Sequence, residues 1–183
     1  MKIIQNIDEA SQLLKQGKII AYPTEAVYGL GCDPFNQNAV EQLLALKQRE
    51  VSKGLIVLIS DWLQLTALIS PVSELSLEPV HQTWPGPVTW IFPKSVTLPS
   101  WVCGAHSTIA IRMTAHPIAK ALCVAAGPII STSANLTGHE PAIDRASLIA
   151  EFPCGVDAML SGALGGHSKP SAIYDVLSGK RWR

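Results

Sequence analysis

The sequence predicts a single-domain α/β protein, with a twisted mixed sheet and flanking helices. Short apolar runs typical of buried strands alternate with amphipathic stretches of helical period along nearly the whole chain. The chain has 183 residues, of which 48% are hydrophobic, so one domain spanning 1–183 can bury a sizeable core. No repeat, low-complexity tract or linker interrupts the alternation.

Six segments have the length and apolar periodicity of helices, and capping or stop residues bound several of them. Asp8 can cap the first helix and Gly17 can end it, while Asn36 or Asn38 can cap the second. Gly127-Pro128 is a strong stop signal after the fifth. The predicted helices cover residues 8–16, 38–49, 61–69, 73–84, 116–126 and 144–152.

Strands are predicted where β-branched and other apolar residues form short runs between turn signals. The first run ends at Pro23, and a later one leads directly into a polar stretch that begins at Ser131. Trp84 and Trp90 lie beside such a run, and we expect both to pack in the core. The predicted strands cover residues 18–22, 55–59, 88–92, 108–113, 129–132, those near Ala158, and 171–176.

Charge is balanced overall but unevenly distributed. Fourteen basic residues match fourteen acidic ones, which argues against a tight nucleic-acid binder. From Pro79 to His139 there is no Asp or Glu, whereas this stretch holds Lys94, Arg112, Lys120 and four histidines. Two interpretations remain open: a locally positive, concave surface suited to phosphates, or core strands that carry few charges because they are buried.

The four cysteines do not have the spacing of a metal site. Cys32, Cys103, Cys123 and Cys154 form no C-x-x-C pair and have no matching His-x-x-His motif. The sequence has no signal-peptide pattern and no apolar run long enough to span a membrane. We therefore expect reduced thiols in a cytoplasmic protein that does not enter a membrane.

Two segments near the start of the chain carry candidate functional residues. In residues 22–31, a strand ends at a proline, and Thr24-Glu25 then precedes Gly29 and Gly31, where the backbone can approach a ligand; a tight turn between two core strands explains the pattern equally well. In residues 47–53, three cations (Lys47, Arg49 and Lys53) lie at the end of the second predicted helix and just after it. They can hold a triphosphate, or they can simply stabilise the helix C-terminus.

Two later segments favour a binding site more strongly. Arg112 interrupts the apolar strand Ile109-Ala110-Ile111, which is costly unless the guanidinium finds a distant acid or a ligand carboxylate or phosphate. Ser131-Thr132-Ser133-Ala134-Asn135 brings several short polar side chains out of a buried strand together, which suits phosphate binding. No Walker A loop, G-x-S-x-G elbow or kinase motif accompanies them.

Taken in order, these segments resemble the YrdC-like family, in particular its short bacterial members. The resemblance rests on P-T-E-x-x-Y-G-L-G at 23–31, K-x-R at 47–49, W-P-G-P-V-T at 84–89, the strand that ends in Arg112, and S-T-S-A-N at 131–135. It covers nearly the whole chain, and it implies an α/β fold with a concave, basic cavity.

The resemblance also implies an activity. Members of the family are threonylcarbamoyl-AMP synthases, which combine L-threonine, bicarbonate and ATP to give threonylcarbamoyl-adenylate and pyrophosphate. Partner proteins then transfer the threonylcarbamoyl group to adenosine 37 of tRNAs that read codons beginning with A. The step requires positioning and charge neutralisation more than a covalent catalyst, so no side-chain general base is expected.

The family's motifs imply a role for each matching residue. Lys47, Arg49, Ser133 and Asn135 would form the catalytic phosphate site, with Mg²⁺ arriving on ATP and no protein ligands to the metal. The residues implied to bind ATP are Lys47, Arg49, Lys53, Thr108, Ser133, Asn135 and Arg183. The residues implied to bind threonine are Thr24, Arg112, Ser131 and Ser171, with Arg112 gripping the carboxylate.

Two departures from the family pattern bear on amino-acid recognition, because Ala26 stands where a second threonine is common and Leu58 where longer relatives often have histidine. An alternative of another class is a non-catalytic module that binds double-stranded RNA or tRNA, or a ribosome maturation factor. A basic concave face would serve such a module equally well, although the neutral net charge counts against it.

Overall fold

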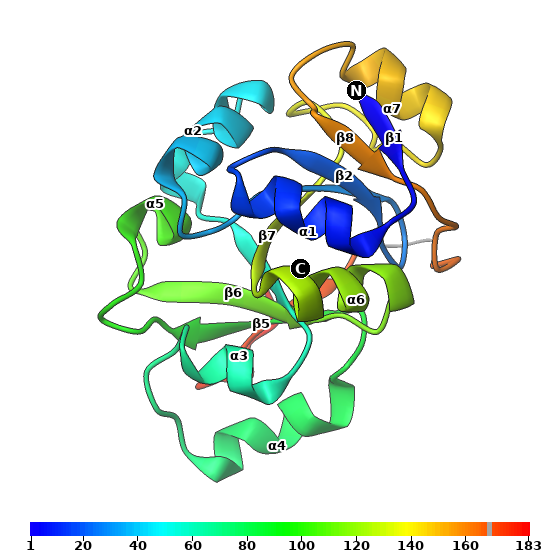
Figure 1. Cartoon of the computed structure of the whole chain (residues 1–183). Helices are drawn as coiled ribbons and strands as arrows, with labels where there is room; N and C mark the ends of the chain where they lie inside the picture. The colour runs from blue at the N-terminus through cyan, green and yellow to red at the C-terminus, as the bar shows by residue number, and fades with distance from the viewer. Residues whose placement is uncertain (168–169) are drawn as a thin grey trace.

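Nine strands form one mixed sheet in the computed structural model, which describes residues 1–167 and 170–183 (Figure 1). Four neighbouring pairs in the sheet are parallel and four are antiparallel. Across the sheet the strands follow the order β1 (Lys2–Ile4), β8 (Ala158–Leu160), β2 (Ile20–Pro23), β3 (Tyr28–Gly31), β7 (Ile129–Ser133), β4 (Ile56–Ile59), β6 (Thr108–Met113), β5 (Val88–Pro93) and β9 (Ala172–Asp175).

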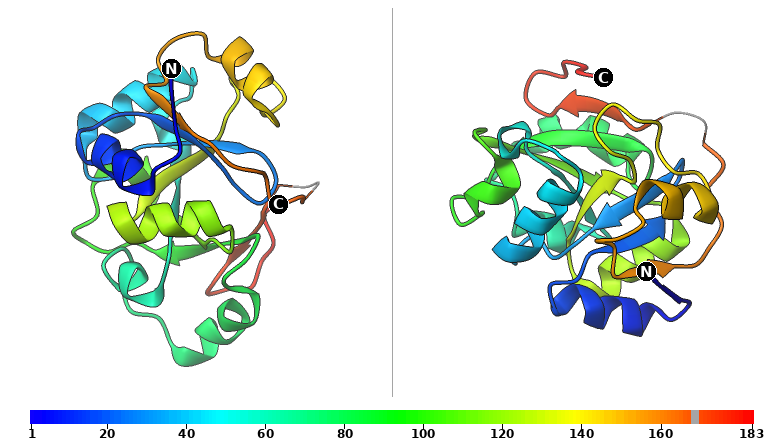
Figure 2. Two further views of the ribbon diagram at one scale, coloured as in Figure 1. Left: turned by 45° about the vertical axis from the view of Figure 1, so that its right-hand side comes forward. Right: turned by 90° about the horizontal axis from the view of Figure 1, so that it is seen from above.

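Helices α1 (Ile7–Lys15) and α6 (Pro117–Ala126) lie against one another over one face of the sheet (Figure 1). The view from above places α1 and the last residues of the chain on opposite sides of the sheet (Figure 2). The remaining helices are α2 (Gln37–Leu46), α3 (Trp62–Thr66), α4 (Glu74–Thr83), α5 (Ser100–Cys103) and α7 (Arg145–Glu151), with a 3₁₀ turn at Val51–Lys53.

Both faces of the central strands are buried, which explains their continuous apolar runs. Because side chains alternate across a strand, Ile20 and Tyr22 pack in the layer beneath α1 and α6, whereas Ile19 and Ala21 pack in the larger layer on the other face. Leu58 is fully buried in the layer beneath α1 and α6. These observations confirm the predicted α/β architecture with a mixed sheet and flanking helices.

Several predicted boundaries were wrong, for local reasons. Asn6, not Asp8, caps α1, because its side-chain oxygen accepts hydrogen bonds from the amides of Asp8 (2.7 Å) and Glu9 (3.4 Å). The helix predicted over 38–49 ends at Leu46, and the positive φ of Gln48 (50°) turns the chain away from the helix.

The sequence analysis also missed the short elements β1, β3 and α5. Strand β3 contains two glycines, which usually weaken a strand prediction. Gly31 is required there, since a Cβ would lie 2.5 Å from the carbonyl oxygen of Ile130 on the neighbouring strand. Trp84 and Trp90 are buried, as predicted.

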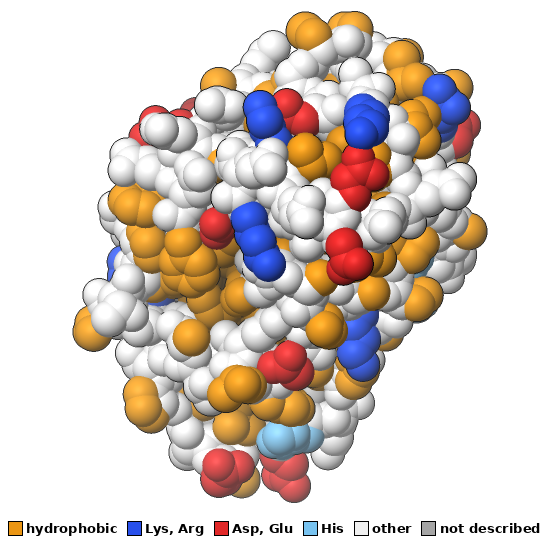
Figure 3. Space-filling view, viewed as in Figure 1, with side chains coloured by type: hydrophobic (Ala, Val, Ile, Leu, Met, Phe, Trp, Pro, Cys, Tyr) orange, Lys and Arg blue, Asp and Glu red, His pale blue; other side chains and the backbone are white. Residues whose placement is uncertain are grey.

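The face that carries α1 and α6 shows positive and negative side chains scattered singly among neutral and apolar ones (Figure 3). No extended patch of one charge is visible on this face. Within residues 1–167 and 170–183, no helix combines the length and apolar character needed to cross a bilayer.

Candidate functional site

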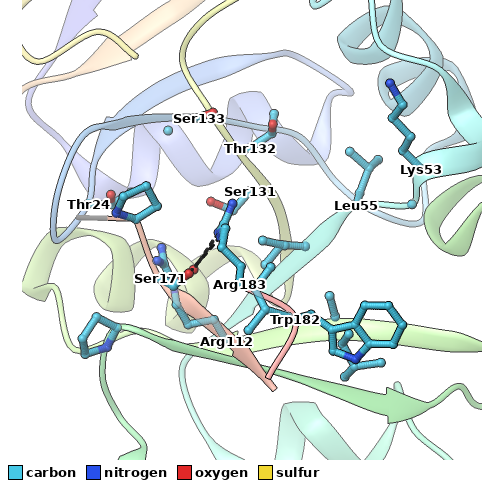
Figure 4. Close-up of a pocket in the computed structure, with 18 of the residues that line it drawn as sticks. Thr24, Lys53, Leu55, Arg112, Ser131, Thr132, Ser133, Ser171, Trp182 and Arg183 are labelled. Atoms are coloured by element: carbon cyan, nitrogen blue, oxygen red, sulfur yellow. Dashed lines mark hydrogen bonds between the residues drawn. The ribbon is translucent and has the colours of Figure 1, made fainter. Parts of the chain in front are cut away.

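A cavity of about 540 Å³ brings together segments that are far apart in the sequence (Figure 4). Its walls come from the turn between β2 and β3, the chain from Arg49 to Ile56, strands β6 and β7, and the segments around Ser171 and Arg183. Among the residues that the structure describes, four cationic side chains (Arg49, Lys53, Arg112, Arg183) and two acidic ones (Glu25, Asp175) line it, so the cations outnumber the acids.

Most of the residues singled out from the sequence line this cavity. Lys47 and Asn135 do not, and they lie directly behind its wall. Of the two departures from the family pattern, Ala26 lines the cavity, whereas Leu58 packs in the core away from it. The predicted residues that line the cavity are Thr24, Arg49, Lys53, Thr108, Arg112, Ser131, Ser133, Ser171 and Arg183.

Arg112 reaches the cavity from strand β6, whose alternation brings Thr108, Ala110 and Arg112 to the same face. Its distant acidic partner is Glu25, whose Oε2 lies 3.4 Å from a terminal guanidinium nitrogen of Arg112. Both side chains are nearly buried, with 12% of Arg112 and 6% of Glu25 exposed. The P-T-E segment therefore supplies the acid that balances the arginine in the strand.

The Glu25 carboxylate is fixed on its other side by the turn after β6. Its Oε1 accepts hydrogen bonds from the Thr114 hydroxyl (2.7 Å) and the Ala115 amide (3.1 Å). Burial alone raises the pKa of Glu25, but Arg112, Thr114 and the backbone amides outweigh that effect and hold the pKa below its usual value. Glu25 Oε2 and Arg112 Nε are buried without a hydrogen-bond partner, so the pair is incompletely satisfied.

Arg49 follows the turn that ends α2. One terminal nitrogen of its guanidinium donates to the Gly54 carbonyl at 3.0 Å, and its buried Nε has no partner. Burial lowers the pKa of this guanidinium. No carboxylate within the described part of the chain forms an ion pair with Arg49. A cation buried in this way attracts an anionic ligand.

Lys47 organises the polar segment that leaves β7. Its ammonium donates to the carbonyl oxygens of Ser133 and Asn135, at 2.5 Å each. Burial, and next the charge of Arg49, lower the pKa of Lys47 to about 8. The Ser133 hydroxyl in turn donates to the side-chain oxygen of Asn135 at 2.5 Å. These two hydrogen bonds use two of the three N–H groups of the ammonium, which leaves one for a ligand.

Ser171 and Arg183 form a second polar group at the opposite wall. Arg183 donates from Nε to the Ser171 carbonyl (3.1 Å) and from a terminal nitrogen to the Ser171 hydroxyl (3.3 Å). Ser171 also shares a hydrogen bond of 3.0 Å with the buried Thr89 hydroxyl. Figure 4 shows Arg183 between Ser171 and Ser131, close to Arg112. Partial burial, followed by the positive charge of Arg112, lowers the pKa of Arg183.

Thr24 lies at the same end of the cavity as Ser171 in this view (Figure 4). Its hydroxyl donates to the Val27 carbonyl at 2.7 Å, which closes the turn between β2 and β3. The Gly165 amide donates to the Thr24 carbonyl at 3.0 Å, and a Cβ at Gly165 would lie 2.8 Å from the Cα of Glu25. The absence of a side chain at Gly165 therefore lets this loop pack against the site.

Sequence reasoning gave Glu25 no specific role and missed two further residues, Glu151 and Trp182. Glu25 stood inside a quoted motif, but its partner Arg112 is remote in sequence. Glu151 accepts a hydrogen bond from the Leu136 amide (2.6 Å) and so braces the segment after Ser133. Trp182 lines the cavity, although no motif pointed to it. In the part of the chain that the structure describes, no cluster of three His, Cys, Asp or Glu side chains could hold a metal ion.

Comparison with known proteins gives a consistent result. The sequence model of the Sua5/YciO/YrdC family, described as "Telomere recombination", matches residues 12–183. Threonylcarbamoyl-AMP synthase of Coxiella burnetii is 51% identical over 177 residues, which cover 96% of this chain and 95% of that protein. The protein of the same name from Methylococcus capsulatus is 49% identical over 95% of this chain and 94% of its own length.

Solved structures show the same fold. P. abyssi Sua5, complexed with L-threonine, superimposes with a TM-score of 0.88 and 30% identity over 95% of this chain. The present chain spans 53% of that longer protein. E. coli YciO matches with a TM-score of 0.82 and 27% identity, over 95% of this chain and 87% of its own. From its sequence and its fold alike, the chain belongs to the Sua5/YciO/YrdC family.

Proposed function

We propose that this protein is a threonylcarbamoyl-AMP synthase, a nucleotidyltransferase that uses L-threonine, bicarbonate and ATP. The observation that carries the proposal is the cavity, in whose described lining four cations, Arg49, Lys53, Arg112 and Arg183, outnumber two acids, Glu25 and Asp175. Such an excess of cations suits a triphosphate together with a carboxylate. Relatives about half identical over nearly their whole length carry this name, which supports an enzyme over a non-catalytic RNA-binding module.

The proposed reaction consists of two balanced chemical steps. The threonine amine adds to bicarbonate, water leaves, and a carbamate forms. A carbamate oxygen then attacks the α-phosphorus of ATP, the bond to the β-phosphate oxygen breaks, and pyrophosphate departs. Negative charge accumulates on the phosphates during this displacement, so fixed cations and hydrogen-bond donors accelerate it more than a covalent nucleophile would.

We assign the phosphates to the wall formed by Arg49, Lys53 and Ser133. Arg49 is the strongest candidate, because its partly buried guanidinium has no ion-pair partner among the described residues and its buried Nε has no hydrogen-bond partner. Lys47 and Asn135 support this wall from behind, and Lys47 fixes the Ser133 and Asn135 carbonyls. Together these four residues, Lys47, Arg49, Ser133 and Asn135, constitute the proposed catalytic group.

We assign threonine to the end of the cavity formed by Thr24, Arg112, Ser131 and Ser171. Arg112 offers its guanidinium to the substrate carboxylate, while Glu25 fixes its orientation. Arg183 and Thr108 extend from this end toward the nucleotide. P. abyssi Sua5, which has the same fold, was solved with L-threonine, and this supports an amino-acid site in the fold.

The remaining parts of the proposal concern the wider reaction. ATP would bind as its Mg²⁺ complex, with the metal held by the phosphates. Partner proteins would take the adenylate and transfer its threonylcarbamoyl group to adenosine 37 of tRNA in the cytoplasm, with some contact between this protein and tRNA.

The test is pyrophosphate release from MgATP by the purified protein, with each substrate omitted in turn. We expect release to require both L-threonine and bicarbonate, and to collapse in Lys47→Ala. Lys18→Ala is the matched control, since Lys18 forms an exposed ion pair of 3.6 Å with Asp157, away from the cavity. Well-folded wild-type protein that releases no pyrophosphate under any condition would exclude the enzyme.

A further inference from the structure

Trp182 is a large aromatic side chain that the fold leaves uncovered. It is 62% exposed and lines the mouth of the cavity. Its backbone is nonetheless fixed, because the Trp182 amide donates to the Ile173 carbonyl (2.8 Å) and the Ile173 amide donates to the Arg183 carbonyl (3.1 Å). The chain thus holds an exposed indole at a defined place beside a binding cavity, where burying its apolar area requires a ligand.

The part of the cavity near Trp182 differs in chemistry from the end that holds Thr24 and Ser171. Figure 4 shows the Trp182 ring extending away from Thr24 and Ser171, on the side where Leu55 and Lys53 lie. The aliphatic and sulfur-containing residues that line the cavity outside the turn between β2 and β3 include Leu55, Ile56, Ile91, Cys103, Ile109 and Ile173. The site therefore combines an end lined by hydroxyl groups and Arg112 with a side where aliphatic residues and the Trp182 ring lie.

The neighbours of Trp182 restrict its ring. The Lys180 ammonium lies 4.5 Å from the centre of the indole, within range of a cation–π interaction. On the same short segment, Arg181 lies over the Tyr174 ring instead, at 6.0 Å. The alternation of residues 180–182 thus brings Lys180 and Trp182 together and sends Arg181 to the other side.

We propose that Trp182 is the residue on which the purine base of the nucleotide stacks, and that it sets the preference for purine over pyrimidine nucleotides. This inference rests on the proposed function, since it assigns one subsite of the same cavity. A planar heterocycle covers the exposed indole and contacts the aliphatic residues on that side, while its triphosphate reaches the cations near Arg49 and Lys53. Purines stack on tryptophan over a larger area than pyrimidines, so the interaction discriminates between them by size.

The test compares Trp182→Ala and Trp182→Phe with the wild type in steady-state pyrophosphate release. Stacking of one base on an aromatic side chain has a free energy that corresponds to about a tenfold change in affinity, so Trp182→Ala should raise the KM for ATP about tenfold. The KM for L-threonine and kcat should stay near the wild-type values. Trp182→Phe should restore most of the affinity, and Trp182→Ala should reduce the preference for ATP over CTP.

Two controls keep the result specific. Leu177→Ala removes a side chain that is 64% exposed close to β9 but does not line the cavity, and it should leave every constant unchanged. Pyrophosphate, which has no base, should inhibit Trp182→Ala and the wild type equally. An unchanged KM for ATP in Trp182→Ala, with normal turnover, would overturn the proposal while leaving the synthase activity established.

A binding measurement separates this inference from the proposed function. ATP should change the tryptophan fluorescence of the wild type but not that of Trp182→Phe, and pyrophosphate should have no such effect on either. This readout does not depend on turnover. An ATP-induced change that persists undiminished in Trp182→Phe would contradict base stacking on Trp182, whatever the activity of the protein.

Discussion

At the scale of single residues, the cavity depends on charges that the fold leaves partly unsatisfied. Arg112 and Glu25 form a nearly buried pair at 3.4 Å, yet Arg112 Nε and Glu25 Oε2 lack hydrogen-bond partners. Arg49 is partly buried, with a buried Nε and no carboxylate paired with it among the described residues. Such arrangements destabilise a fold unless a ligand completes them, which is why they indicate a binding site.

Glu25→Gln should lower the free energy of unfolding at neutral pH. It should also make the free energy of unfolding less dependent on pH in the acidic range. The folded-state pKa of Glu25 lies below its ordinary value of 4.5, so its contribution is fully present above pH 4.5. The contribution disappears as pH falls through the lower folded-state pKa. Urea unfolding between neutral pH and about pH 3 should show wild type and variant converging in acid.

The matched control for that prediction is Glu74→Gln, which changes an exposed carboxylate in the first turn of α4. It should leave the difference between neutral and acid stability close to that of the wild type. Parallel curves for wild type and Glu25→Gln across the whole range would mean that Glu25 does not depend on Arg112 as described.

Arg49→Met should weaken the use of ATP without a comparable loss of protein stability. Hydrogen bonds to charged groups contribute about 1.5–3 kcal/mol, so losing those made to a phosphate should lower kcat/KM for ATP about 10- to 100-fold. The midpoint of thermal unfolding should change little, since removing a partly buried cation that has no acidic partner among the described residues offsets the loss of its hydrogen bond to the Gly54 carbonyl. Arg145→Met, at an exposed position in α7, serves as control. A large loss of stability in Arg49→Met would assign the residue a structural role instead.

At the scale of elements, the segment that follows β7 is held from two sides. Lys47 donates to its carbonyls at Ser133 and Asn135, and the Thr137 hydroxyl returns a hydrogen bond to the Lys47 carbonyl at 3.1 Å. From α7, Glu151 accepts a hydrogen bond from the Leu136 amide. The turn after α2 and the first residues after β7 therefore move as one unit, and this unit forms the proposed phosphate wall.

Lys47→Met should loosen that unit. The variant leaves two carbonyls without their donor, and a buried polar group that loses its partner costs about 1–3 kcal/mol. We expect a lower unfolding midpoint and a loss of pyrophosphate release, with the KM for L-threonine less affected than kcat. Lys18→Met should change stability by less than about 1 kcal/mol, as expected for an exposed ion pair. Wild-type stability in Lys47→Met would show that the carbonyls do not need the ammonium.

Helices and strands whose apolar residues recur with a clear periodicity could be predicted from the sequence. Elements that depend on tertiary contacts could not. Strand β6 was found because Thr108–Met113 is apolar and β-branched. Strand β3 was missed because glycines weaken a strand prediction, and the close approach of β7 that requires Gly31 is revealed only by the folded chain. In the site, hydroxyls and cations stood out as motifs, but the pairing of Glu25 with Arg112 joins segments remote in sequence, and no local pattern encodes it.

At the scale of the whole molecule, the cavity is a property of the complete sheet. Its walls include β3 and β7 from the middle of the sheet and β5 and β9 from one edge. A ligand in the cavity therefore contacts segments from Thr24 to Arg183, and its binding energy adds to the stability of the entire fold. This coupling predicts that bound substrates stabilise the whole protein against unfolding.

MgATP should raise the unfolding midpoint of the wild type in a manner that depends on its concentration. At a hundred times its Kd, a ligand that binds only the native state adds about 2.7 kcal/mol. The shift produced by MgATP should be clearly smaller in Arg49→Met than in the wild type, and the shift produced by L-threonine should be smaller in Arg112→Met. Thermal scans at several ligand concentrations measure it, and a midpoint that does not respond to MgATP would contradict the nucleotide site.

The most direct test of the central claim is to follow the carbon of bicarbonate into the product. The protein is incubated with MgATP, L-threonine and ¹³C-bicarbonate, and the quenched mixture is analysed by mass spectrometry. The account predicts threonylcarbamoyl-adenylate that carries one ¹³C, formed in step with pyrophosphate and absent when threonine is omitted. Pyrophosphate released together with unlabelled threonyl-adenylate, or with AMP alone, would contradict it.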